Sequence, residues 1–206
     1  MFITFEGIDR AGKTTQASML AEALGPEAVL VREPGGTPES ERIRALVKDP
    51  EAQFTPVSET LLFGAARAEL VERVVRPALA AGKVVISDRY IDSTVAYQGG
   101  ARGLGIIRVE ELNDWIAGGL WPDVTFLLDL PAGEAGSRPG ELDRLEGEGE
   151  SLQRAVAAAY DELAERHPDR YVRIDASRPA EEIHADALAE VNNRRALHRG
   201  AGTPAG

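Results

Sequence analysis

The sequence has 206 residues, of which 43% are hydrophobic, and this is enough for one substantial hydrophobic core. Its net charge of -11 argues against general nucleic-acid binding, because such binding depends on Lys and Arg neutralising phosphates. The lack of cysteine excludes disulfides and thiolate metal sites, and no segment reaches the roughly 18 apolar residues of a membrane span. Residues 1–6 show no signal-peptide pattern. Together with the net charge and the lack of a long apolar segment, this predicts a cytoplasmic protein that binds neither nucleic acid nor membrane.

Short apolar segments alternate along the chain with segments of helical periodicity. Strands are predicted at 2–6, 28–32, 84–86, 124–128 and 171–174. Helices are predicted at 14–23, 40–47, 55–81, 91–98, 109–118, 151–166 and 180–195. We expect Pro77 to kink the longest helix or end its regular part. Because strands one, three and four are continuous apolar runs, they favour a parallel sheet covered on both faces. The sequence therefore predicts an α/β fold, with a five-stranded parallel sheet in a three-layer α/β/α arrangement.

Two segments do not follow this alternation. Residues 131–150 are rich in Gly, Glu and Arg with poor periodicity, which predicts a short lid. Residues 194–206 are rich in Gly, Pro and Ala, and we expect them to form a disordered tail. The remainder predicts a single domain over residues 1–193.

A phosphate-binding loop follows the first strand. Residues 7–14 match G-x-x-x-x-G-K-S/T, the P-loop of nucleoside triphosphate-binding proteins, between a predicted strand and a predicted helix. In this pattern the backbone cradles the phosphates, Lys13 reaches the β- and γ-phosphates, and the Thr14 hydroxyl binds Mg²⁺. The positive end of the following helix adds to phosphate binding. The predicted binding residues for the triphosphate, most simply ATP, are Gly7, Ile8, Asp9, Arg10, Ala11, Gly12, Lys13, Thr14 and Thr15.

Two charged residues inside the loop need a role of their own. Arg10 can stabilise the transferring phosphoryl group as an arginine finger does, or it is a solvated loop arginine. Asp9 would be repelled by a bound triphosphate, so it must face a substrate hydroxyl or a metal-bound water. Asp88, at the end of the third strand, has the form of a Walker B carboxylate for Mg²⁺, beside Arg89 in the same crevice. The alternative for Asp88 and Arg89 is a surface ion pair.

The class of P-loop protein follows from what accompanies the loop. The Asn-Lys-x-Asp motif with which GTPases read guanine is absent from the sequence, and the chain is short for a motor or AAA-type ATPase. A P-loop, an Asp-Arg element and an Arg-bearing segment are the parts of a small phosphotransferase that closes over two nucleotides.

At this point the chain resembles the thymidylate kinase family. The resemblance runs from residue 1 to about 190 and lies in FEGIDRAGKTTQ (5–16), REPGGT (32–37), ETLLF (59–63) with Arg67, DRYIDSTVAYQG (88–99), WPD (121–123) and LDRLE (142–146). It implies phosphorylation of dTMP to dTDP with ATP and Mg²⁺ by a homodimer. Two positions depart from the family, Ala66 in place of its usual Asp and Leu70 in place of a frequent His. These departures concern either local packing or the dimer face.

The acceptor site can be read partly from spacing. Phe63 and Arg67 share one helix face, and an aromatic plane beside a forked donor suits a nucleobase such as thymine, whose O4 is an acceptor. Phe63 could instead be a core residue. The resemblance assigns Thr94 and Gln98 to the base edge and Tyr97 to the 2′ position, although Tyr97 by itself could be a half-buried aromatic. It assigns Arg44 and Arg89 to the dTMP phosphate, Asp9 to the 3′-hydroxyl or its metal-bound water, and Glu33 to the neighbourhood of that phosphate.

The implied reaction is an in-line attack of a dTMP phosphate oxygen on the γ-phosphorus of ATP. Its predicted catalytic residues are Lys13, Arg10, Arg89 and the lid residue Arg144, with Arg10 favoured over Arg138 and Arg144 as the main charge stabiliser. Residues 175–179, after the fifth strand, are expected to form the adenine wall. Two alternatives stay open: a kinase of another deoxynucleotide or a deoxynucleoside, and a regulatory module whose P-loop switches conformation without phosphotransfer.

Overall fold

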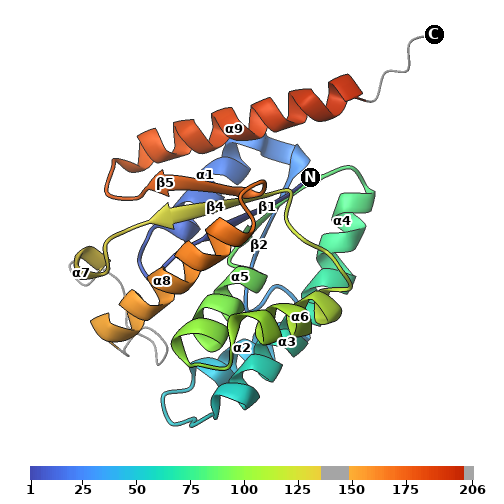
Figure 1. Cartoon of the computed structure of the whole chain (residues 1–206). Helices are drawn as coiled ribbons and strands as arrows, with labels where there is room; N and C mark the ends of the chain where they lie inside the picture. Colours follow the sequence, from blue (N-terminus) through green and yellow to red (C-terminus); the bar gives the residue numbers. More distant parts are fainter. Residues whose placement is uncertain (136–148, 202–206) are drawn as a thin grey trace.

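The computed structural model describes residues 1–135 and 149–201, and its centre is a five-stranded parallel sheet. The strands lie in the order β2-β3-β1-β4-β5 (Figure 1). Their bounds are β1 Phe2–Glu6, β2 Ala28–Arg32, β3 Val84–Asp88, β4 Val124–Asp129 and β5 Tyr171–Asp175. The predicted α/β class and the five-stranded parallel sheet are therefore confirmed.

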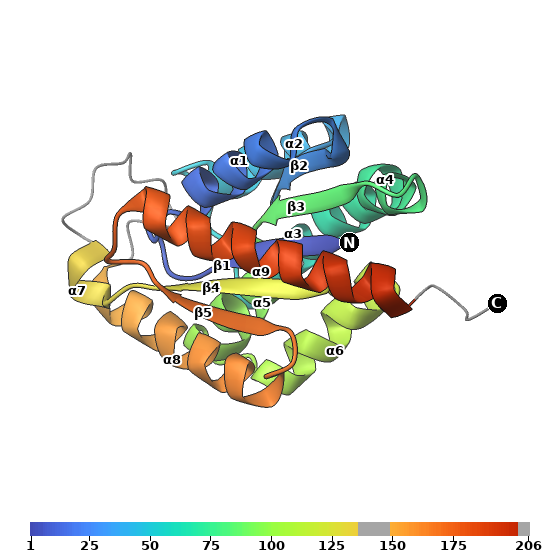
Figure 2. The same ribbon diagram turned by 90° about the horizontal axis from the view of Figure 1, so that it is seen from above.

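Helices cover both faces of the sheet. Figure 1 shows α1 and α9 on one side and α3, α5, α6 and α8 on the other, and the turned view in Figure 2 shows the same division. The helices are α1 Lys13–Leu24, α2 Pro38–Lys48, α3 Pro56–Leu70, α4 Arg76–Ala80, α5 Ile91–Thr94, α6 Ile106–Ala117, α7 Ala132–Ala135, α8 Glu150–Arg166 and α9 Ala180–Ala201. A short 3-10 helix, η1 Gly25–Glu27, and two π-helical segments, η2 Val71–Val75 and η3 Val95–Ala101, complete the described elements.

The core follows from the apolar runs of the central strands. Every residue of β1 is buried, and β3 and β4 are buried up to their last residues. The edge strands β2 and β5 carry exposed positions, as expected where only one neighbouring strand is present. Because all five strands are parallel, their carboxyl ends meet at one edge, where β1 ends beside Asp88 of β3. This edge places the P-loop next to the Asp88-Arg89 pair.

Three helices differ from the prediction. The helix expected at 55–81 is interrupted by η2, which ends two residues before Pro77, near the irregularity that we expect at this proline. The helix expected at 91–98 leaves α geometry after Thr94 and continues as η3. The helix expected at 109–118 begins earlier, at Ile106.

The predicted tail is also partly wrong. Helix α9 continues to Ala201, so residues 194–201 are helical rather than disordered. Arg194 donates to Glu190 and to the backbone oxygen of Asp123, and Arg195 pairs with Glu27, which fixes this part of the helix to the body. Composition alone missed these partners, since they lie far away in the sequence. Residues 202–206 lie outside the described residues, as do residues 136–148 of the predicted lid.

Candidate active site

The P-loop and the turn after β3 contain residues in unusual backbone conformations. Gly7 has φ 137°, and a Cβ there would lie 2.6 Å from the carbonyl oxygen of Leu128, so only glycine fits. Arg10 has φ 60° and Arg89 has φ 69°, both in a region that side chains other than glycine rarely adopt. Strain of this kind collects at functional sites, where the surrounding structure maintains it. The two arginines that we predict to act on phosphates are therefore both held in unusual conformations.

Lys13 lies inside the curl of the loop, at the first position of α1. Its side chain is buried, and Nζ donates to the carbonyl oxygen of Ile8 at 2.5 Å. Burial, with the neighbouring Arg89 charge, lowers the pKa of Lys13 to about 8. Its ammonium is thus poorly compensated within the loop and is placed to gain from an incoming phosphate.

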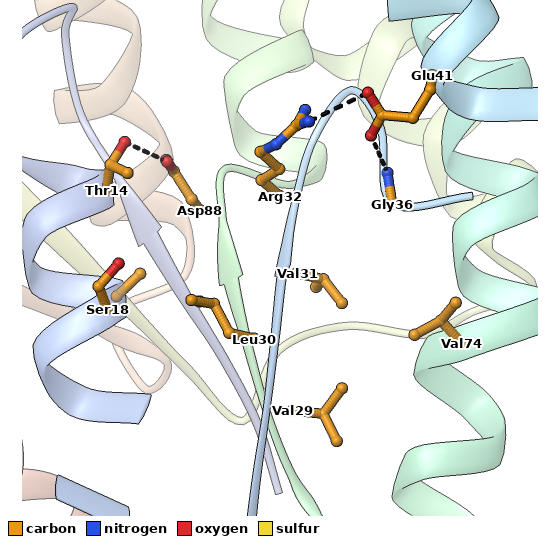
Figure 3. A pocket seen from close by; sticks show the side chains of 11 residues that line it. Thr14, Ser18, Val29, Leu30, Val31, Arg32, Gly36, Glu41, Val74 and Asp88 are labelled. Atoms are coloured by element: carbon orange, nitrogen blue, oxygen red, sulfur yellow. Dashed lines mark hydrogen bonds and ion pairs between the residues drawn. The ribbon is translucent and has the colours of Figure 1, made fainter. Parts of the chain in front are cut away.

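Thr14 and Asp88 form the predicted metal pair. The Thr14 hydroxyl donates to Asp88 Oδ2 at 2.5 Å across the gap between α1 and β3 (Figure 3). A hydroxyl and a carboxylate are oxygen ligands suited to Mg²⁺, which takes one or two protein ligands beside substrate phosphates and water. Within residues 1–135 and 149–201 no group of three or more His, Asp or Glu side chains could hold a metal.

A pocket of about 380 Å³ opens beside this pair. Its walls come from α1, β2 and β3 and from Val74 of η2 (Figure 3). Across it from Thr14 and Asp88, Arg32 pairs with Glu41 at 3.1 Å, and Glu41 also accepts from the backbone of Gly36 at 2.7 Å. Thr14 and Asp88 therefore lie at the rim of an open space rather than in the packed core.

Asp9 is the centre of a second polar cluster. Its Oδ1 accepts from Arg89 and from the Tyr97 hydroxyl (2.8 Å), and its Oδ2 accepts from Gln153 Nε2 at 2.6 Å. Burial opposes ionisation of Asp9, but the charges of Arg89 and Lys13 and these hydrogen bonds outweigh it and lower its pKa. The structure thus brings together Asp9, Arg89 and Tyr97, which the sequence placed on one substrate.

Gln153 was missed by the sequence analysis. It lies in the first turn of α8. Its amide forms two hydrogen bonds with Asp9, because Oε1 accepts from the Asp9 backbone N–H at 3.1 Å and Nε2 donates to the Asp9 carboxylate. The available signal was a polar residue at a buried position of an amphipathic helix, in line with Val156, Tyr160 and Leu163.

Glu6, at the end of the first strand, was given no role by the sequence analysis. Its carboxylate accepts from the Tyr90 backbone N–H (2.6 Å), the Ser93 hydroxyl (2.6 Å) and the Tyr160 hydroxyl (2.8 Å). Burial, with the nearby Asp92 charge, raises the pKa of Glu6 to about 7. The carboxylate joins the end of β1 to the turn after Arg89 and to α8. The available signal was an acidic residue that ends a fully buried strand.

Arg67 is buried, with only 2% of it exposed, and its donors meet several acceptors. Nε and Nη2 bond Glu33 Oε2 at 2.9 and 2.6 Å, Nη2 also reaches Thr94 Oγ1 at 3.0 Å, and Nη1 donates to Asn113. Burial raises the pKa of Glu33 in spite of the Arg67 charge. In this arrangement Glu33 anchors Arg67, a role that the sequence analysis did not give it, and Asn113 is a further partner that it missed.

Of the other predicted acceptor residues, Phe63 and Gln98 lie near Arg67 and Thr94, and Arg44 lies near Glu33. Phe63 is half-buried one helical turn before Arg67, and Gln98, one turn after Thr94, donates from Nε2 to Glu59 at 2.8 Å. Arg44 of α2 donates to the carbonyl oxygen of Pro34 at 2.8 Å, beside Glu33. Arg10 is half-buried and Thr15 is exposed at the P-loop, while Arg138 and Arg144 lie outside the described residues.

Comparison with known proteins decides the family. The model of the family described as thymidylate kinase matches residues 5–187. The chain belongs to the thymidylate kinase family. It is similar to thymidylate kinases of Chlorobium chlorochromatii (44% identical, covering 96% of this chain and 97% of that one) and Pseudomonas fluorescens (47% identical, covering 97% and 99%). It is also similar to a crystal structure of thymidylate kinase from Ehrlichia chaffeensis, with a TM-score of 0.76, 35% identity and coverage of 93% and 98%.

The two positions that depart from the family pattern are both buried. Ala66 and Leu70 are each 1% exposed. The backbone oxygen of Ala66 accepts from the Ser40 hydroxyl at 2.8 Å, and Leu70 lies against Gly36, where a Cβ would meet its Cδ1 at 2.7 Å. Both positions therefore belong to the contact of α3 with α2 and the 33–37 turn.

Across residues 1–135 and 149–201, no helix has the length and apolar character needed to cross a membrane.

Proposed function

We propose that this chain is a dTMP kinase that transfers the γ-phosphoryl group of ATP to dTMP, giving dTDP and ADP. A dTMP phosphate oxygen forms the new bond to the γ-phosphorus as the bond to the β,γ-bridging oxygen breaks, and that oxygen leaves with ADP. The observation that supports this most is the Asp9–Arg89 pair, because it brings an acceptor-side cluster onto the P-loop itself.

On the donor side, Lys13, the loop backbone and the N-terminus of α1 bind the triphosphate. Thr14 and Asp88 would hold Mg²⁺, which would supply neutralisation of phosphate charge. Residues 175–179 follow β5 at the same sheet edge, and Gln16 of α1 donates to the backbone oxygen of Ala180 at 2.8 Å. This hydrogen bond holds the segment after residues 175–179 against α1, which supports the assignment of residues 175–179 to the adenine wall.

On the acceptor side, the thymine ring stacks on Phe63 and its O4 accepts from Arg67. Thr94 and Gln98 line the base edge, and Tyr97 crowds the 2′ position. Arg44 and Arg89 bind the dTMP phosphate, and Asp9 receives the 3′-hydroxyl or its metal-bound water. Glu33, being the partner of Arg67, acts on the base site through that arginine.

Charge developing in the transfer is offset by Lys13, Arg10 and Arg89, with Arg144 as a further contributor. Both Arg10 and Arg89 have their side chains placed from strained backbone beside the loop, which supports their assignment. We further propose one kinase domain over residues 1–193, with residues 131–150 as its lid, working in the cytoplasm without nucleic-acid or membrane partners.

We also propose a homodimer through the face made by α3 and α6. Large apolar side chains are exposed there, namely Val57, Leu61, Ile107 and Trp115, the last with 78% exposed. The two helices are in close contact, since a Cβ on Gly64 would lie 2.6 Å from Ile116 Cδ1. An apolar surface shared by two packed helices is the kind of surface that a second copy covers.

A coupled assay of ADP formation tests the function. Purified protein with ATP and Mg²⁺ should phosphorylate dTMP faster than dUMP, dCMP or dGMP at equal concentration. If another monophosphate or a deoxynucleoside is phosphorylated as fast as dTMP or faster, dTMP is not the preferred acceptor. Nucleotide binding without any transfer would instead support a regulatory module.

A further inference from the structure

One face of α3 carries three residues at intervals of four, Glu59, Phe63 and Arg67. Both ends of this face are tied to the segment α5–η3. Arg67 donates to Thr94 Oγ1 at 3.0 Å, and Glu59 Oε1 accepts from Gln98 Nε2 at 2.8 Å. Phe63 lies one helical turn from each of Glu59 and Arg67, midway between them along α3.

The orientation of the Gln98 amide follows from its partner. An amide has a donor end and an acceptor end of nearly the same shape, so hydrogen bonds decide which end faces where. Glu59 is 1% exposed, and its carboxylate offers only acceptors. The same oxygen of Glu59 also accepts from Arg102 Nε, at 2.9 Å. The NH₂ group of Gln98 must therefore face Glu59, and the opposite end, its carbonyl, bonds no donor among the described residues.

We propose that Glu59 is a positioning residue that sets base specificity by holding the amide of Gln98 so that Gln98 Oε1 faces the base as an acceptor. Thymine matches this arrangement, because its N3–H donates to Gln98 Oε1 while its O4 accepts from Arg67. Cytosine mismatches at both points, because its N3 is an acceptor and its exocyclic amine is a donor. A buried mismatch of this kind leaves polar groups unpaired, which is the strongest form of discrimination a site can build. The inference rests on the proposed function, in which the acceptor base lies on Phe63.

The test compares kcat/KM for dTMP with kcat/KM for dCMP in matched variants. Glu59→Met keeps most of the side-chain volume and removes the acceptor, so Gln98 is free to turn its NH₂ toward cytosine N3. We expect the ratio of kcat/KM for dTMP to kcat/KM for dCMP to fall by about tenfold, which corresponds to the free energy of one hydrogen bond. KM for ATP should be unchanged. Loosening of the fold alone would lower both activities by the same factor and leave the ratio as it is.

A second pair of variants covers the case in which Glu59→Met does not fold. Arg102→Met keeps the Glu59 carboxylate and should keep the dTMP preference. The double variant Arg102→Met with Glu59→Gln replaces the carboxylate by an amide that can face Gln98 with either end, so its preference should narrow relative to Arg102→Met. An unchanged ratio in the double variant, with dTMP still phosphorylated, overturns the proposal. Failure of the wild-type protein to phosphorylate dTMP is a different result, which overturns the proposed function.

Discussion

The base contact that we propose for Arg67 comes from a side chain that also forms a buried ion pair with Glu33. The guanidinium is buried with Glu33, and the second oxygen of Glu33, Oε1, is buried without a hydrogen bond among the described residues. Removing the arginine leaves a buried carboxyl without its counter-charge, which typically costs about 3–5 kcal/mol. A loss of activity in Arg67→Met would therefore mix misfolding with lost base contact.

A double variant separates the two effects. We expect Arg67→Met to be destabilised by about 3 kcal/mol, and Arg67→Met with Glu33→Gln to regain much of that loss, because no buried charge is left. KM for dTMP should stay at least tenfold raised in both proteins, since the donor to thymine O4 is absent. Urea unfolding and steady-state kinetics measure the two quantities. Recovery of the dTMP KM in the double variant would contradict the base-contact role of Arg67.

Glu6 makes the stability depend on pH in a direction opposite to that of an ordinary ion-paired carboxylate. Its folded pKa of about 7 lies above the unfolded value of 4.5, so between these values the folded protein binds more protons than the unfolded chain. Stability contributed by this group is therefore complete below pH 4.5 and declines as pH rises through 7. The decline should be on the order of 1–3 kcal/mol.

The comparison with Glu6→Gln isolates this effect. Glutamine cannot ionise, so the difference in unfolding free energy between wild type and Glu6→Gln should shift against the wild type from pH 4.5 to 8. Urea unfolding at several pH values, with Asp161→Asn as an exposed control, measures it. Parallel pH profiles for wild type and Glu6→Gln would show that Glu6 does not titrate in this range.

At the level of elements, the strands were predictable and the ends of several helices were not. Continuous apolar runs leave few alternatives for β1, β3 and β4. The π-helical segments η2 and η3 have no periodic signature, and the end of α9 depends on partners such as Glu27 that are distant in sequence. The same distinction holds in the site. The P-loop and Asp88 follow from local motifs, whereas the pairing of Gln153 with Asp9 and of Asn113 with Arg67 becomes visible only when their helices pack.

The first turn of α8 is coupled to the P-loop through Gln153. We expect Gln153→Leu to raise KM for dTMP several-fold, because Asp9 loses an amide donor and its backbone N–H loses an acceptor. Amide exchange in the first turn of α8 should also become faster. The neighbouring Arg154→Ala, which removes only an exposed pair with Glu150, is the matched control and should change neither. Equal behaviour of both variants would place Gln153 outside the acceptor site.

At the level of the whole molecule, the strand order brings together the residues that we assign to the two substrates. With β1 in the centre, between β3 and β4, the P-loop emerges beside Asp88 and Arg89. Helix α8 contributes Gln153 from the other side of the same loop. Lys13 and Thr14, which we assign to the donor, and Asp9, which we assign to the acceptor, therefore lie within the same eight-residue loop, residues 7–14.

The proposed dimer predicts which surface substitutions change the oligomeric state. Trp115→Glu places a charge in the α3–α6 face and should convert a dimer to a monomer in sedimentation velocity, because a buried charge without a partner is unfavourable at an interface. Leu197→Glu in α9 is the matched control, since Leu197 is similarly exposed, at 73%, on the opposite side of the sheet. It should leave the dimer intact. A wild-type monomer, or dissociation by Leu197→Glu alone, would move the interface away from α3 and α6. Loss of dTMP phosphorylation that follows dissociation would further indicate that α3, which carries Phe63 and Arg67, depends on the second copy for its placement.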